Sequence, residues 1–202
     1  MAKSKRAQTV PDHLRARISL RVAPVNWLEK ARQLRKSANL LFVVFENEQL
    51  EFGKQFERDP SLMEGWPDDT TILLLLGFAV ENLLKGLFVS ALPEPRKIKE
   101  LKALGMPSAY HALEPLANAI SLSLSIEFSR EERDLLDVLE HAVQWGGRYP
   151  SPTSIDGLIL LGDHGRFKKF YLNYPAEHFA VVSLYDRLDL LLEGRLAGLS
   201  RQ

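Results

Sequence analysis

The 202-residue sequence contains no cysteine, and its basic and acidic residues balance at 26 each. The missing cysteine excludes disulfides, thiolate metal sites and a cysteine nucleophile. A net charge of zero gives no overall attraction to nucleic acid or to a membrane, so any such binding must depend on local patches. The N-terminus also lacks the apolar segment of a signal peptide, and we expect a cytoplasmic location.

Several motifs that bind nucleotides or metals are missing as well. The sequence has no Walker loop, no GxGxxG and no nucleophile elbow. Its five histidines form neither an HExxH motif nor the paired Glu-x-x-His motifs of a ferritin-like di-metal site. We therefore predict neither a metal nor a cofactor.

The longest apolar stretch is 71–91 (TILLLLGFAVENLLKGLFVSA), whose only charged residues are Glu81 and Lys85. A helix that is apolar on nearly every side belongs in the interior of a protein. The stretch is also long enough to span a membrane, but two charges near its middle would each cost several kcal/mol in a bilayer. We expect the central helix of a soluble bundle, capped by Asp68 or Asp69.

The pair Glu81 and Lys85 has two interpretations. The two residues are four apart and can form an internal salt bridge that fixes how the helices pack. Alternatively, they line a polar groove between helices and bind a ligand there. The sequence leaves both open.

Apolar residues spaced three and four apart predict four more helices around the central one. The first runs from an N-cap at Asn26 to about Phe56, and a short one covers 111–120. The last begins near Pro175 and ends around 194–199, with Phe179 on its apolar face. The predicted fold class is all-α, an up-and-down four-helix bundle with an additional helix and an irregular segment at 151–174.

The remaining helix begins with a capping box, Ser129-x-x-Glu132, and ends at Gly146-Gly147. The segment Trp145-Gly-Gly-Arg148-Tyr149-Pro then places an arginine and two aromatic rings at a helix end. This segment is either a helix C-cap with aromatic packing, or a site for phosphate contact and base stacking.

The N-terminal residues 1–24 form a basic arm ahead of a single helical domain at 25–200. A second basic patch lies at 96–102. The arm is either a solvated tail or a contact for nucleic acid or a partner, and the patch is either a solvated connector or a phosphate-facing loop. The basic residues of the arm are Lys3, Lys5, Arg6, Arg15, Arg17 and Arg21.

Three segments in this order resemble the HEPN superfamily of helical domains, which are often linked to nucleotides or RNA. They are Leu75–Leu92, the Tyr-His-Ala-Leu-x-x-Leu motif at 110–116, and Glu131–Pro150, whose Trp-x-Gly-Arg-Tyr-Pro ending is similar to a bacterial branch of the superfamily. The resemblance covers about residues 26–150. It implies a HEPN-like module, forming a homodimer, that binds RNA, a nucleotide or a partner protein, with Glu81, Lys85, Trp145, Arg148 and Tyr149 as ligand-binding candidates.

Ribonucleases of that superfamily use an arginine and a histidine separated by four to six residues. Here Arg133 and His141 have seven residues between them. The resemblance therefore favours binding without catalysis. The alternatives are a divergent metal-independent ribonuclease of toxin–antitoxin or phage-defence type, with His111, His141 and Arg148 as catalytic candidates, and a purely structural interaction domain.

Overall fold

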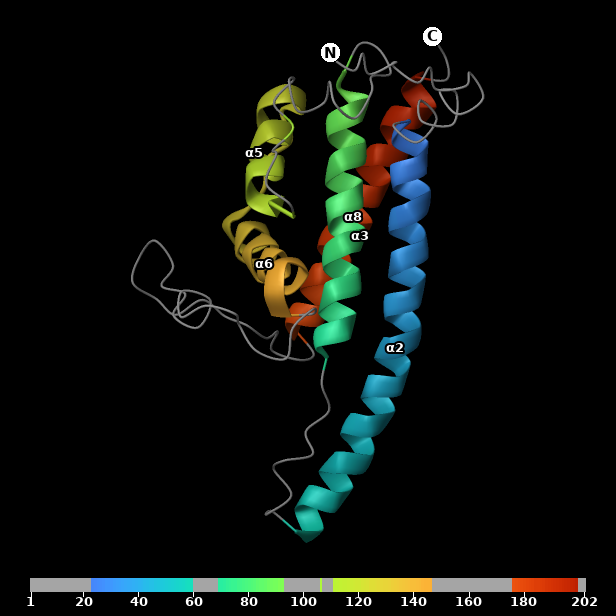
Figure 1. Ribbon diagram of the computed structural model, residues 1–202, viewed down its shortest axis with the longest axis vertical. Helices are drawn as coiled ribbons and strands as arrows, with labels where there is room; N and C mark the ends of the chain where they lie inside the picture. Colours follow the sequence, from blue (N-terminus) through green and yellow to red (C-terminus); the bar gives the residue numbers. More distant parts are fainter. Residues whose placement is uncertain (1–22, 60–68, 93–105, 107–110, 147–175, 200–202) are drawn as a thin grey trace, which may run out of the picture.

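The computed structural model of the protein describes residues 23–59, 69–92, 106, 111–146 and 176–199. Every regular element within these ranges is helical (Figure 1), so the predicted all-α class is confirmed. Three of the predicted features lie wholly or almost wholly outside the described residues. They are the basic arm at 1–24, the basic patch at 96–102 and the irregular segment at 151–174.

Helix α3, Thr70–Ser90, is the centre of the bundle, as its apolar sequence predicts. It packs against α2 and α8 as well as α5 and α6, and Figure 1 shows α2 on one side of it and α5 and α6 on the other. Asp69 takes the N-cap position, although its side chain makes no capping hydrogen bond. By length and composition α3 could cross a membrane, but 72% of its apolar window is buried inside the protein. Such burial is typical of a core helix.

Helix α2, Pro24–Arg58, is 35 residues long and begins before the predicted start. The prediction of Asn26 as N-cap is wrong, because Pro24 opens the helix and the Asn26 N–H already bonds to the Ala23 carbonyl. Proline suits the first helical position, where its missing N–H costs no intrahelical hydrogen bond. The helix ends at Arg58, just before Asp59 and the proline that follows it.

The next two helices form a pair beside α3. Helix α5, Leu113–Leu124, starts two residues after the predicted start and ends four residues later than predicted. Helix α6, Arg130–His141, begins with the predicted capping box of Ser129 and Glu132. It continues into a π-helical turn, η2, at Ala142–Gly146, which the sequence did not predict.

Helix α8, Ala176–Leu199, packs against α2, α3 and α6. The prediction that Phe179 faces the core is wrong, since that side chain is 54% exposed. His178 takes the inward position instead, because it shares a helical face with the buried Val181 and Tyr185. Its ring stacks on Phe42 of α2, with the ring centroids 3.7 Å apart.

Two glycines let α3 approach its neighbours closely. A Cβ atom at Gly77 would lie 2.5 Å from a methyl group of Val143 and 3.1 Å from the Leu139 carbonyl oxygen. A Cβ atom at Gly86 would collide with Leu192 of α8. Glu81 and Lys85 therefore lie on a helix that is packed closely against its neighbours.

Candidate functional site

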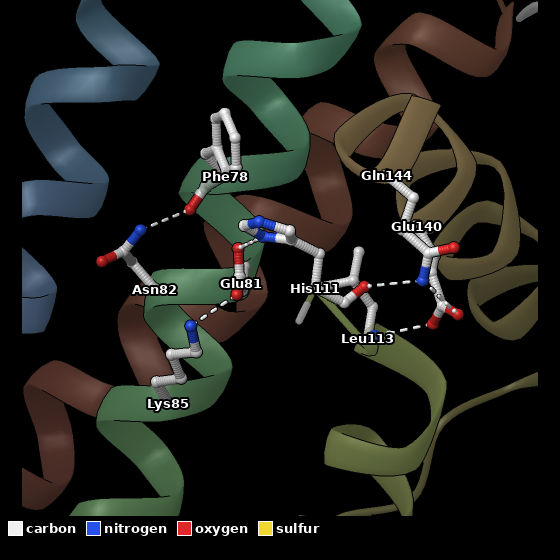
Figure 2. Close-up of polar contacts among 8 residues, drawn as sticks. All are labelled: Phe78, Glu81, Asn82, Lys85, His111, Leu113, Glu140 and Gln144. Carbon is white, nitrogen blue, oxygen red and sulfur yellow. Dashed lines mark hydrogen bonds and ion pairs between the residues drawn. The ribbon is translucent and has the colours of Figure 1, made fainter. Parts of the chain in front are cut away.

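The buried carboxylate of Glu81 is the centre of a polar cluster where α3 meets the start of α5 (Figure 2). Its side chain is 4% exposed, and one of its oxygens, Oε1, accepts a hydrogen bond from Lys85 Nζ one turn further along α3. The other oxygen, Oε2, lies 2.9 Å from Nδ1 of His111. Burying a carboxylate is costly unless it is paired, and here both oxygens are engaged.

Lys85 is positioned by groups on two helices. Besides its ion pair with Glu81, its ammonium lies over the ring of Trp27 from α2, 5.6 Å from the ring centroid. The side chain is 28% exposed. A lysine in this setting keeps its stem against apolar surface and its charge near water.

His111 has an unusual backbone conformation, with φ at 62° in the left-handed region. Such values in residues other than glycine are uncommon and often mark functional sites. Gln144 of the π-helical turn donates to the His111 carbonyl oxygen at 3.3 Å, and the rings of His111 and Phe78 form a T-shaped pair. When Nδ1–H donates to a carboxylate, the acceptor of a neutral imidazole is Nε2.

Glu140 of α6 organises the other side of the cluster (Figure 2). Its Oε2 atom accepts the backbone N–H groups of Leu113 at 2.7 Å and Glu114 at 3.1 Å, and Oε1 accepts from Gln144. The N-cap residue of α5, Ala112, has no side chain able to do this. A carboxylate from another helix therefore caps α5 and complements its dipole.

The structure thus brings together three of the predicted site residues: Glu81, Lys85 and His111. The predicted salt bridge between Glu81 and Lys85 is present, and it shares its carboxylate with His111. Sequence reasoning missed Glu140 and Gln144. The one signal in the sequence was Ala112 at the N-cap of α5. An alanine cannot cap a helix, so the cap has to come from another segment.

The other predicted site residues are His141, Trp145, Arg148 and Tyr149. His141 is the last residue of α6. Arg148, Tyr149 and the side chain of Trp145 lie outside the described residues. Within the described ranges no three His, Asp or Glu side chains are arranged to hold a metal ion.

Arg133, which is separated from His141 by seven residues, serves as a contact between helices. Its guanidinium pairs with Glu114 of α5 at 2.5 Å and donates to Asn118 at 2.8 Å. Arg133 therefore joins α6 to α5 through an ion pair and a hydrogen bond.

Comparison of the chain with protein-family models, with curated proteins and with solved structures gave no match. The resemblance to the HEPN superfamily accordingly stays a prediction.

Proposed function

We propose that this chain is a HEPN-like helical module that binds a phosphate group of RNA or of a nucleotide through Lys85 and His111, without catalysis. The observation that carries the proposal is the buried Glu81 carboxylate, which holds both of these side chains at the edge of the bundle. In this interpretation α2, α3, α5 and α6 are the four-helix bundle and α8 is the additional helix.

Lys85 supplies the donors that suit an anion at this site. Its charge is paired with Glu81, while the carboxylate of Glu140 accepts from the first backbone N–H groups of α5. Lysine has three N–H donors and is a common phosphate ligand in proteins. Both side chains are partly exposed, Lys85 by 28% and His111 by 19%, so a ligand at the surface can reach them.

Binding is measured by fluorescence anisotropy with labelled single-stranded RNA, and by competition with ATP and with inorganic phosphate. Lys85→Met keeps the apolar stem and removes the charge, and we expect it to weaken binding about tenfold, the equivalent of one charge-assisted hydrogen bond. Lys30→Met, on the exposed surface of α2, removes the same charge elsewhere and should leave affinity almost unchanged. Equal losses in the two variants, or no binding of any of the three ligands, would refute the proposal.

One observation favours the ribonuclease alternative. The contact of Glu81 with Nδ1 of His111 is the arrangement by which a carboxylate orients a histidine for general base catalysis. Such a histidine could take the proton from a ribose 2′-hydroxyl as its oxygen attacks the adjacent phosphorus. The bond from phosphorus to the 5′-oxygen of the next nucleotide then breaks, and that oxygen takes up a proton. Incubation of the purified chain with total RNA decides between the two, with His111→Gln and the sequence-predicted Arg148→Ala alongside. Intact RNA at high protein concentration excludes the enzyme.

The third candidate is a purely structural interaction domain, in which the cluster only joins α3 to α5. It predicts that substitutions of Lys85 and His111 change stability and nothing else. Measuring the unfolding free energy of each variant beside its ligand affinity separates this candidate from the other two.

A further inference from the structure

The face of α2 that points away from the bundle carries an exposed apolar stripe. Leu40, Val43, Val44 and Leu50 are each more than half exposed, although they lie on the helix that supplies Ala38 and Phe45 to the core. Apolar side chains gathered in this way on a surface often mark an interaction site. Part of α2 also extends beyond the first residues of α3, past the other helices that the structure describes (Figure 1).

Charged and polar residues continue this stripe in both directions along the same helical face. All of these residues are exposed, and they are spaced three, four or seven apart as one side of a helix requires. We call this set the α2 outer face. It comprises Glu29, Gln33, Lys36, Leu40, Val43, Val44, Asn47, Leu50, Glu51, Lys54 and Arg58.

The charges of the α2 outer face match those of a second copy placed antiparallel. In a two-fold arrangement centred between Val43 and Val44, Lys36 faces the partner's Glu51 and Glu29 faces the partner's Arg58. The same axis brings Val43 against the partner's Val44. Each contact occurs twice, because a two-fold interface is the same patch on both subunits.

Other arrangements of the two helices are less favourable. A parallel pair places Lys36 against the partner's Lys36 and Glu51 against the partner's Glu51. A shift of the antiparallel pair by seven residues in one direction places Glu29 against the partner's Glu51. The same shift in the other direction places Lys36 against the partner's Arg58, so both shifts pair like charges. Flanking charges commonly decide the orientation of paired helices in this way.

We propose that two copies of this chain associate through the α2 outer face as an antiparallel helix pair with this register. The seam, from Glu29 to Arg58, is about 44 Å long at 1.5 Å per residue. Each bundle then lies behind its own α2, on opposite sides of the seam. This proposal is independent of phosphate binding at Lys85.

The oligomeric state of the full chain tests the proposal. Sedimentation velocity across the micromolar range, where moderate affinities lie, should show a dimer that dissociates on dilution. Val43→Glu puts two carboxylates, one from each copy, at the centre of the seam and should give a monomer with an unchanged circular dichroism spectrum. Leu122→Glu, a similar change at an exposed leucine of α5, should leave the dimer intact. A wild-type chain that stays monomeric throughout overturns the proposal, and so does a dimer that Val43→Glu does not weaken.

The register can be tested by crosslinking, because the chain has no cysteine of its own. Lys36→Cys and Glu51→Cys chains are mixed and treated with a short thiol-reactive crosslinker. A covalent dimer should form in the mixture and be nearly absent when either variant is treated alone. Crosslinking of Lys36→Cys with itself, or no crosslink in the mixture, overturns the antiparallel register.

Charge reversal supplies a second test of the same register. Lys36→Glu should weaken the dimer several-fold, because it places an acid against the partner's Glu51. Adding Glu51→Lys to the same chain restores the opposite charges in both copies and should recover the affinity. A double variant no tighter than Lys36→Glu alone counts against this pairing.

Discussion

The Nδ1 atom of His111 lies 2.9 Å from the Oε2 atom of Glu81, although the two residues are 30 positions apart in the sequence. The contact joins the middle of the central helix to the turn that starts α5. Because Lys85 occupies the other carboxylate oxygen, Glu81 is the shared partner of two polar side chains from separate segments. The substitution of Glu81 should therefore affect stability more than the substitution of either partner.

Replacing Glu81 with alanine should lower the free energy of unfolding by about 3 kcal/mol. The change leaves Lys85 without its carboxylate in a partly buried place, and removing one member of a buried ion pair is strongly destabilising. Urea unfolding followed by circular dichroism measures the effect. A loss below about 1 kcal/mol, the size of an exposed ion pair, would contradict the importance of burial here.

The double variant Glu81→Met/Lys85→Met is the matched control for that prediction. Replacing both members of a buried pair by apolar residues of similar size is often nearly neutral. We expect the double variant to be more stable than Glu81→Ala and to have lost its affinity for phosphate. A stable double variant that still binds phosphate with full affinity would contradict the role of Lys85.

Glu140→Ala should destabilise the protein by about 1–2 kcal/mol, because the first N–H groups of α5 lose their acceptor and the helix dipole loses a nearby negative charge. Ser129→Ala removes an ordinary capping side chain from α6 and is the comparison, with an expected cost of about 1 kcal/mol. Thermal unfolding of both variants checks the prediction. If Glu140→Ala costs no more than an average surface change, about 0.5 kcal/mol, the cap contributes nothing measurable.

The sequence predicted the parts of this structure that depend on local patterns. A continuous apolar run predicted the central position of α3, and the spacing of Ser129 and Glu132 predicted the start of α6. The i,i+4 spacing of Glu81 and Lys85 predicted their ion pair as one of two interpretations. Each of these features involves residues within a few turns of one another.

The parts that the sequence did not predict depend on tertiary contacts. Glu140 caps a helix that begins 27 residues before it, and no local spacing signals such a cap. Apolarity favoured Phe179 for the core, but the positions of Val181 and Tyr185 set the phase of α8 and turned His178 inward. The left-handed backbone of His111 likewise depends on partners from α3 and η2.

Gly77→Ala should destabilise the protein by about 1–3 kcal/mol. The new methyl group would meet the Leu139 carbonyl oxygen at 3.1 Å as well as the Val143 side chain, and helix backbone yields less readily than a side chain. Gly53→Ala on α2 is the control, since no atom lies within 4 Å of its added Cβ. That change should stabilise α2 by about 0.5–1 kcal/mol through helix propensity. Equal effects on the melting temperature would contradict the close approach at Gly77.

His178 should make the protein less stable as the pH falls through the weakly acidic range. Burial and, to a smaller extent, the charge of Arg35 lower the pKa of its imidazole from 6.5 to about 4, against a smaller opposite effect of Glu46. The folded chain thus keeps this ring neutral at pH values where the unfolded chain protonates it. The resulting stability is fully present above about pH 6.5 and decreases as the pH falls toward 4, by up to about 3 kcal/mol.

His178→Phe retains a ring against Phe42 and does not titrate, so its stability advantage over the wild type should grow between pH 6.5 and 4.5. Both chains contain the same carboxylates, whose titration cancels in the comparison. Unfolding curves in urea at several pH values measure the difference, and a gap between the two chains that stays constant with pH would contradict a neutral, buried His178.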